Sequence, residues 1–163
     1  MGGQIFVMFK EELEKILSES VKELVSNDAY LLEHDVHEQA ISAKLACYIS
    51  KRMPFPPSET WHVDVEYNRN GKSPKSLANQ GNVKPDIIIH RRSLNNDKGH
   101  ENNNLLVIEL KKNPTTFDQK KDLFKIRAFI EDRPYHFKYG LFIVITTLNS
   151  KNPMKFTWLE RKF

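Results

Sequence analysis

The chain has 163 residues, of which 39% are hydrophobic and 28% charged, and its formal net charge at pH 7 is +4. A chain of this length usually forms one domain with a real core, and this composition excludes wholesale disorder. The charge is compatible with a polyanionic partner without requiring one. No apolar run reaches the length of about 18 residues that a membrane span needs, and no signal-peptide pattern begins the sequence. The default expectation is a cytoplasmic protein without a membrane partner.

Two helical patterns open the chain. Apolar residues spaced three and four apart predict a helix over residues 8–26. A second helix is expected from about Asp35 to Arg52, because Glu38 follows Asp35 at the spacing of a capping box. The single cysteine, Cys47, excludes an internal disulfide and a cysteine-based zinc site. Its place on an apolar-patterned helix predicts a buried side chain.

Strands and loops follow in the middle of the chain. Strict alternation of apolar and polar residues over 61–68 predicts a half-buried strand. Residues 69–83 are rich in Gly, Asn, Lys and Pro, so a long mobile loop is expected there. Three consecutive isoleucines in residues 86–90 predict a buried strand. The polar tract 93–104 is typical of an extended hairpin connection.

The remaining elements complete an α/β pattern. Residues 104–112 predict a strand buried on both faces, and a capping box at 116–119 begins a helix that reaches about Glu131. Strands are expected over 140–147 and 155–159. The order helix, helix, strand, strand, strand, helix, strand, strand predicts a mixed central sheet with helices on both faces. We expect one domain over 1–163, with its core at 35–147 and the N-terminal helix appended.

Charged residues interrupt two of these buried strands. Glu109 and Lys111 are two residues apart, so both side chains point to one side of the sheet. Asp86 directly follows Pro85 at the start of the isoleucine strand. If the two strands are neighbours, Asp86 and Glu109 converge on one point, with Lys111 one pleat further along. Close carboxylates repel and a buried charge is costly, and a divalent cation such as Mg²⁺ removes both penalties.

The residues Pro85-Asp86 and Glu109-Leu110-Lys111, followed by a helix and a strand, resemble the PD-(D/E)xK nuclease superfamily, which has the restriction-endonuclease-like fold. The resemblance implies that Asp86, Glu109 and the main-chain carbonyl of Leu110 bind Mg²⁺ or Mn²⁺. It also implies that Lys111 is the catalytic lysine. Many members, Holliday-junction resolvases among them, add a glutamate from the preceding helix, and Glu38 occupies that place. The resemblance implies that Glu38 is catalytic and assists through a second metal ion or a metal-bound water.

The function implied is a metal-dependent endonuclease that hydrolyses phosphodiester bonds, with DNA as the favoured substrate. A homodimer is compatible with this fold class, since one site cuts one strand. Two alternatives stay open. One is a catalytically silent nucleic-acid-binding or assembly module of the same fold, and the other is a metal-dependent hydrolase of a different substrate.

Each candidate residue also has a plainer interpretation. Glu109 and Lys111 at a strand end fit an exposed surface pair that contributes little stability. Glu38 fits the capping box as well as a side chain that points into the site. Asp64, on the polar side of its strand, is either exposed to solvent or an auxiliary metal ligand.

Lysines supply candidate contacts to a nucleic-acid backbone. Two lie in the loop after Arg69 and two on the helix after the motif: Lys72, Lys75, Lys121 and Lys125. For the helical pair, a solvated face is the alternative, because Asp118 and Asp122 are interleaved with the lysines.

Overall fold

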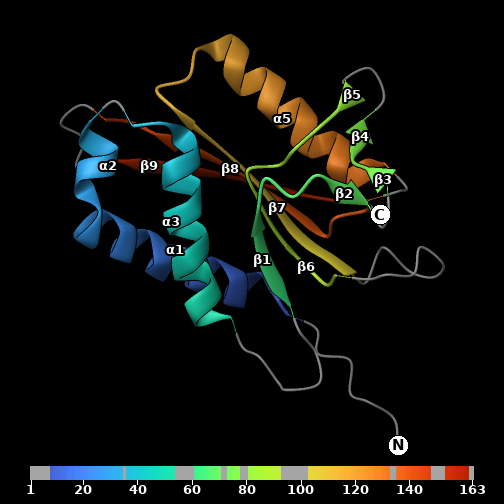
Figure 1. Cartoon of the computed structure of the whole chain (residues 1–163), viewed down its shortest axis with the longest axis horizontal. Helices are drawn as coiled ribbons and strands as arrows, with labels where there is room; N and C mark the ends of the chain where they lie inside the picture. The colour runs from blue at the N-terminus through green and yellow to red at the C-terminus, as the bar shows by residue number, and fades with distance from the viewer. Residues whose placement is uncertain are drawn as a thin grey trace, which may run out of the picture.

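A five-stranded mixed sheet lies at the centre of the computed structural model, with helices on both of its faces (Figure 1). The structure describes residues 8–34, 36–53, 61–70, 73–77, 81–92, 103–132, 135–147 and 153–161. The strand order is β1-β6-β7-β8-β9, and only β7 and β8 pair in parallel within this sheet. The strands are β1 (His62–Val65), β6 (Ile87–His90), β7 (Asn104–Lys112), β8 (Tyr139–Ile145) and β9 (Met154–Glu160). The predicted α/β class with a mixed sheet is confirmed.

The described long helices divide between the two faces of this sheet. One face is covered by α1 (Lys10–Asn27) and α3 (Glu38–Arg52), and the other by α5 (Thr116–Glu131). A short helix that the sequence analysis did not predict, α2 (Ala29–Glu33), lies between α1 and α3 in the chain. Leucines of α1 belong to the same apolar cluster as α3 and the sheet, so α1 is part of the core. No helix within the described ranges is long and apolar enough to cross a membrane.

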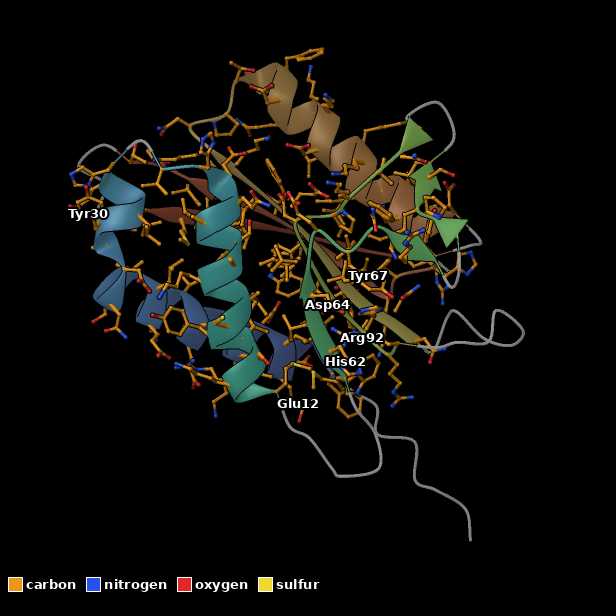
Figure 2. All side chains as sticks on the ribbon, in the orientation of Figure 1. Glu12, Tyr30, His62, Asp64, Tyr67 and Arg92 are labelled. Carbon is orange, nitrogen blue, oxygen red and sulfur yellow. The ribbon has the colours of Figure 1, made fainter. Side chains whose placement is uncertain are left out.

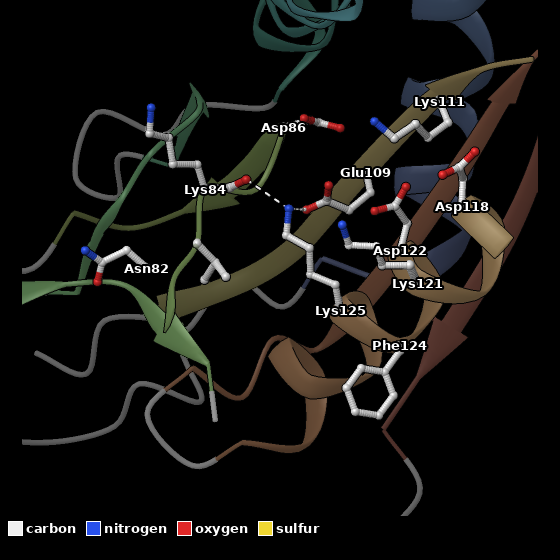
Figure 3. A pocket seen from close by; sticks show the side chains of 11 residues that line it. Asn82, Lys84, Asp86, Glu109, Lys111, Asp118, Lys121, Asp122, Phe124 and Lys125 are labelled. Carbon is white, nitrogen blue, oxygen red and sulfur yellow. Dashed lines mark hydrogen bonds and ion pairs between the residues drawn. The ribbon is translucent and has the colours of Figure 1, made fainter. Parts of the chain in front are cut away.

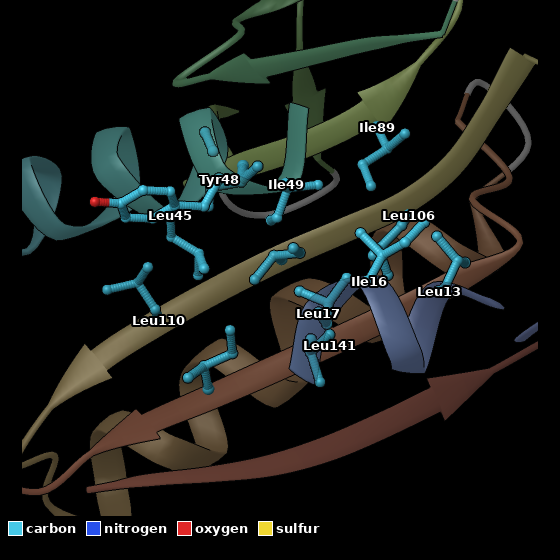
Figure 4. Close-up of a cluster of buried hydrophobic side chains, with 14 of the residues drawn as sticks. Leu13, Ile16, Leu17, Leu45, Tyr48, Ile49, Ile89, Leu106, Leu110 and Leu141 are labelled. Atoms are coloured by element: carbon cyan, nitrogen blue, oxygen red, sulfur yellow. The ribbon is translucent and has the colours of Figure 1, made fainter. Parts of the chain in front are cut away.

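The central strand β7 is buried on both faces, as its continuous apolar run predicted. Leu106 and Leu110 belong to the cluster under α1 and α3, whereas Val107 belongs to the cluster under α5. Figure 4 shows Leu45 of α3 and Leu17 of α1 in the first cluster, together with Leu106 and Leu110 of β7. Full burial of one such aliphatic side chain stabilises the fold by about 1.5–3 kcal/mol. By alternation, Glu109 follows Val107 on the α5 face, where a charge is unexpected.

The described residues of the segment 69–83 contain short strands that the expected loop did not include. Its described residues form two short antiparallel pairs, β2 (Arg69–Asn70) with β3 (Ser73–Pro74) and β4 (Ser76–Leu77) with β5 (Gly81–Asn82). The Tyr135 hydroxyl holds this segment, because it donates to the carbonyl of Ser76 and accepts from its N–H, each at 2.7 Å. Most of the tract 93–104 lies outside the described residues.

Helix boundaries differ from the predictions by a few residues. Thr115 is the N-cap of α5, and it shares reciprocal hydrogen bonds with Asp118, so this capping box begins one residue earlier than expected. The N-cap of α3 is His37, while the predicted cap, Asp35, lies outside the described residues. Cys47 was expected to be buried and is exposed, since it lies on the outer side of α3.

Gly140 of β8 sets how closely α5 approaches the sheet. A Cβ atom built on Gly140 would overlap the side chain of Ile126 and stand 2.8 Å from Cδ1 of Ile130. Both isoleucines are fully buried on α5 and cannot move away without disturbing the core.

We therefore predict that Gly140→Ala lowers the free energy of unfolding by about 1–3 kcal/mol, the usual cost of overpacking. Chemical denaturation measures this change. Combining it with Ile126→Ala, which removes the Cγ2 methyl that a Cβ would overlap, should cost less than the sum of the two single losses. Additive losses in the double variant would contradict the overpacking explanation.

Candidate active site at the ends of strands β6 and β7

Asp86 and Glu109 come together where the pairing of β6 with β7 ends. The last antiparallel pair is Ile87 with Ile108, and the same register places Asp86 opposite Glu109. The two strands are neighbours, as the sequence analysis required, and both carboxylates line one cleft together with Lys111. Figure 3 shows Asp86, Glu109 and Lys111 around this cleft.

Among the described residues, no strand lies beside the edge of β7 beyond Ile108 on the β6 side, and two acidic side chains accept hydrogen bonds from its N–H groups. Asp86 Oδ2 accepts the N–H of Leu110 at 2.8 Å, and Glu38 Oε1 accepts the N–H of Lys112 at 2.8 Å. In a strand the N–H and C=O of one residue point to the same edge. The carbonyl of Leu110 therefore opens toward Asp86, the place implied for a further metal ligand.

Glu38 points into the site. It is the first residue of α3, directly after the N-cap His37, and not the third residue that a capping box requires, so the capping-box interpretation is wrong. Its Oε2 accepts a hydrogen bond from Lys111 Nζ at 2.9 Å. This hydrogen bond raises the pKa of the Lys111 ammonium, which therefore stays protonated at neutral pH. The exposed surface pair of Glu109 with Lys111 does not form, since Lys111 pairs with Glu38.

Glu109 is a buried carboxylate whose one ion-pair partner among the described residues is Lys125. Only 3% of its surface is exposed, and burial together with repulsion from Asp86 raises its pKa well above the ordinary value. Lys125 Nζ lies 2.8 Å from Glu109 Oε1, an ion pair that lacks the angular geometry of a hydrogen bond. Lys125 also donates to the carbonyl of Lys84 at 3.0 Å. Lys125 is thus turned into the cleft and does not belong to a solvated face.

Asp122 is a third carboxylate of the cleft, and the sequence analysis assigned it no role there. It is 7% exposed, and its Oδ2 has no hydrogen-bond partner among the described residues. Burial raises the pKa of Asp122, and burial, countered in part by the Leu110 N–H, also raises that of Asp86. Helical spacing could have located it, because Asp122 lies four residues before Ile126 and seven before Phe129, both of which are buried.

The cleft has a volume of about 690 Å³ and is balanced in charge. Four carboxylates and four lysines line it: Asp86, Glu109, Asp118 and Asp122, with Lys84, Lys111, Lys121 and Lys125. The carboxylates Asp86, Glu109 and Asp122 are the more buried groups, whereas Lys84 and Lys121 are exposed at the rim. The interior of the cleft is therefore rich in oxygen ligands, and its rim is basic.

The residues present fit a hard divalent cation. Within the described ranges, no group of three or more His, Cys, Asp or Glu side chains is arranged so that it could hold a metal ion. Mg²⁺, however, usually takes only one or two protein carboxylates and completes its shell with water and phosphate. Asp86 and Glu109 supply that number. Burial is the main cause of the raised pKa values of Asp86 and Glu109, and Oδ2 of Asp122 has no hydrogen-bond partner among the described residues, so a cation there would stabilise the charged form of buried oxygens.

Asp64 is not part of this cleft. His90 Nε2 lies 2.8 Å from Asp64 Oδ2, and Arg92 Nε donates to the same oxygen at 2.9 Å. Figure 2 shows Asp64 with His62, Tyr67 and Arg92 beside β1. Because these partners occupy its carboxylate, the structure brings Asp64 neither to solvent nor to Asp86 and Glu109, and the auxiliary-ligand prediction is wrong.

The four lysines predicted to contact nucleic acid have different positions. Lys75 is 3% exposed and donates to the carbonyl of Arg69, with its ammonium over the ring of Tyr67, so it cannot contact a phosphate backbone. Lys72 lies outside the described residues. Lys121 is exposed at the cleft rim, and Lys125 pairs with Glu109.

No protein-family model matches the chain, and no curated protein or solved structure matches it.

We predict that Lys75→Met stabilises the protein at neutral pH. Burial lowers the pKa of Lys75 from 10.5 to about 8, so the unfolded chain binds more protons between these two values. The free energy of unfolding should accordingly rise as the pH increases from about 8 to 10.5. Below pH 8 the buried ammonium of Lys75 is charged and destabilises the fold. Removing the charge should raise the free energy of unfolding at pH 7 by about 1–3 kcal/mol.

Urea denaturation at several pH values measures both effects. Lys44→Met, which removes an exposed lysine paired with Asp28, is the control and should change neither the stability nor its slope with pH appreciably. The assignment of a buried, destabilising ammonium would be contradicted if Lys75→Met were less stable than wild type and its free energy of unfolding still rose with pH above 8.

We predict that Asp122→Asn stabilises the protein in the presence of a chelator. The pKa of Asp122 is higher in the folded protein than in the unfolded chain. The stability contributed by its protonated form is therefore lost as the pH rises above the ordinary pKa of an aspartate. The amide should remove that loss and raise the free energy of unfolding at neutral pH by an amount on the order of 1 kcal/mol. Thermal denaturation in EDTA between acidic and neutral pH measures the change. Asp118→Asn, an exposed carboxylate in the N-terminal capping box of the same helix, should instead destabilise.

Proposed function

We propose that this chain is a divalent-metal-dependent nuclease that hydrolyses phosphodiester bonds, with DNA as its favoured substrate. The observation that carries the proposal is the meeting of two carboxylates with raised pKa, Asp86 and Glu109, at an open strand edge beside a charged Lys111. The restriction-endonuclease-like form of the α/β fold and a homodimeric assembly belong to the same proposal. They rest on the motif and on the agreement of element order.

Asp86, Glu109 and the carbonyl of Leu110 would hold the cation, which is Mg²⁺ or Mn²⁺. A bound cation would neutralise the carboxylates and polarise a phosphate oxygen. Asp86 is positioned by the N–H of Leu110, and Glu109 by β7 itself. These groups therefore stand at fixed places before a substrate arrives, as electrostatic catalysis requires.

Lys111 would orient the attacking water and stabilise the charge that grows on the phosphate. Glu38 holds the Lys111 ammonium at 2.9 Å and favours its charged form. A phosphodiester gains negative charge as water attacks, so an ammonium fixed beside it stabilises the transition state more than the ground state. Glu38 acts through Lys111 and is a positioning residue. Lys84 and Lys121 at the rim attract the phosphates on either side.

A catalytically silent binding module is the second candidate, and the ion pair of Lys125 with Glu109 favours it. In that module Lys125 neutralises Glu109 permanently and the chain needs no cation. The two candidates differ in the response to Lys125→Met. In a module without a cation, Lys125→Met should lower stability, and no added metal should restore it. In a nuclease, Mg²⁺ or Mn²⁺ should restore the stability that Lys125→Met loses.

We predict that Lys111→Met lowers the rate of cleavage by about a hundredfold or more, the scale of losing one transition-state donor. Methionine keeps most of the side-chain volume and removes the charge, so folding and binding of Mn²⁺ should persist. The measurement is a cleavage panel of duplex, single-stranded and branched DNA with Mg²⁺, Mn²⁺ or EDTA. Lys44→Met, which removes one exposed positive charge from the surface of α3, is the matched control and should cut at the wild-type rate.

The cation is tested separately by calorimetric titration with Mn²⁺. Asp86→Ala should abolish the binding that wild type shows. Equal cleavage by wild type and Lys111→Met would place the active site elsewhere, and unchanged Mn²⁺ binding by Asp86→Ala would rule out this metal site. A wild type that binds DNA and cuts nothing under any condition would favour the silent module.

A further inference from the structure

The solvent side of α5 carries two phenylalanines that the described residues leave uncovered. Phe117 is 75% exposed and Phe124 is 64% exposed. They are seven residues apart, which is about two helical turns, so their rings lie in one row about 10 Å apart along the helix axis. The buried residues of α5, Ile126 and Phe129 among them, lie on the opposite side. The row therefore contributes nothing to the core.

Lysines share this side of the helix with the two rings. Lys120 and Lys121 lie between Phe117 and Phe124 in the chain, and both are exposed. Helical spacing places each of them within about 60° of the row. Lys121 and Phe124 also line the cleft, so the row borders the candidate active site (Figure 3). We name these four residues, Phe117, Lys120, Lys121 and Phe124, the α5 platform.

This composition suits unpaired nucleotides better than a protein partner. Surfaces that bind single strands combine aromatic rings, on which bases stack, with cations that contact the phosphates. The centres of protein interfaces are depleted in lysine, because its ammonium must lose water when it is covered. In an uninterrupted duplex the base faces are stacked on each other and cannot reach a ring.

We propose that the α5 platform binds unpaired bases, and that the substrate class of this chain is nucleic acid with a single-stranded segment next to the scissile phosphate. The inference rests on the proposed function for the cutting step alone, since the platform can bind without turnover. Bases stacked on Phe124 would lie beside Lys121 at the rim, and the connected phosphate would enter the cleft toward Asp86 and Glu109. Phe117 would bind a base further along the same strand.

The test is fluorescence anisotropy with the full chain in EDTA, where no cutting occurs. The probes are a short labelled single strand of DNA, the same strand made of abasic nucleotides, and a blunt duplex. The double variant Phe117→Ala/Phe124→Ala should bind the single strand at least about fivefold more weakly, the lower end of the effect of losing one base stack. Its affinity for the abasic strand and the duplex should equal that of wild type.

Matched controls separate stacking from general damage. Both phenylalanines are exposed, so the double variant should fold normally, which circular dichroism checks. Phe9→Ala removes a phenylalanine that is 62% exposed at the start of α1 and should not change binding. Phe117→Tyr/Phe124→Tyr keeps both rings and should bind the single strand as wild type does.

Each outcome decides one proposal. Undiminished single-strand binding by the alanine variant overturns the platform, as does a wild type that does not bind the single strand. Weaker self-association of the alanine variant in sedimentation, with unchanged DNA affinity, would make this side of α5 an interface between copies and also overturn it. A wild type that shows ring-dependent binding but cuts nothing with Mg²⁺ or Mn²⁺ contradicts the nuclease proposal and leaves the platform intact.

Discussion

The candidate site depends on β7 extending beyond β6. Pairing of these strands stops at Ile87 and Ile108, while pairing of β7 with β8 continues to Lys112. Residues 109–112 are therefore held in a rigid strand on one edge and open on the other. Free backbone groups at an open edge need partners, and here two carboxylates provide them. Asp86 binds the N–H of Leu110, and Glu38 binds that of Lys112.

That backbone requirement explains why residues far apart in the sequence meet at one point. Glu38 begins α3, Asp86 precedes β6, and both are attached to successive free N–H groups of the same strand edge. The second oxygen of Glu38 then holds Lys111. The hydrogen bond from Leu110 N–H engages one oxygen of Asp86, and the Asp86 and Glu109 side chains both line the cleft. The fold thus concentrates negative charge where its own hydrogen bonds cannot neutralise it completely.

Much of this arrangement could be predicted from the sequence, because alternation and apolar runs report directly on a sheet. The all-isoleucine run and the run 105–108 predicted β6 and β7 as buried strands, and the carboxylates that interrupt them indicated the candidate site. Asp86 and Glu109 can converge only if β6 and β7 are neighbours, and this adjacency is confirmed. The first residue of α3 was harder to predict from the sequence. Aspartate is a preferred N-cap residue and histidine is not, so the sequence favoured Asp35 over the observed N-cap, His37.

Polar residues whose partners are distant in sequence were not predictable in the same way. Lys75 is buried because Tyr67 and Tyr135 surround its ammonium, and Tyr135 lies sixty residues further along the chain. Asp64 is taken up by His90 and Arg92, which the local alternation of β1 does not reveal. Local composition describes an average surface lysine or aspartate. It contains no information on which side chains the topology brings close.

Asp122 and Lys125 show how the cleft can tolerate its own charge. Both come from α5, whose approach to the sheet is set by Gly140, and they stand one turn apart on the side of the helix that faces β7. Lys125 offsets Glu109 through a contact of 2.8 Å, whereas Asp122 adds a charge that has no hydrogen-bond partner on Oδ2 within the described residues. A purely structural ion pair would gain nothing from that third carboxylate, since it raises the cost of burying the other two. A cleft that accepts a divalent cation and a phosphate benefits from it, because the same oxygens become ligands or hydrogen-bond acceptors once positive charge is present. The unpartnered oxygen of Asp122 in the cleft of Asp86 and Glu109 is thus a feature that a structural ion pair does not explain.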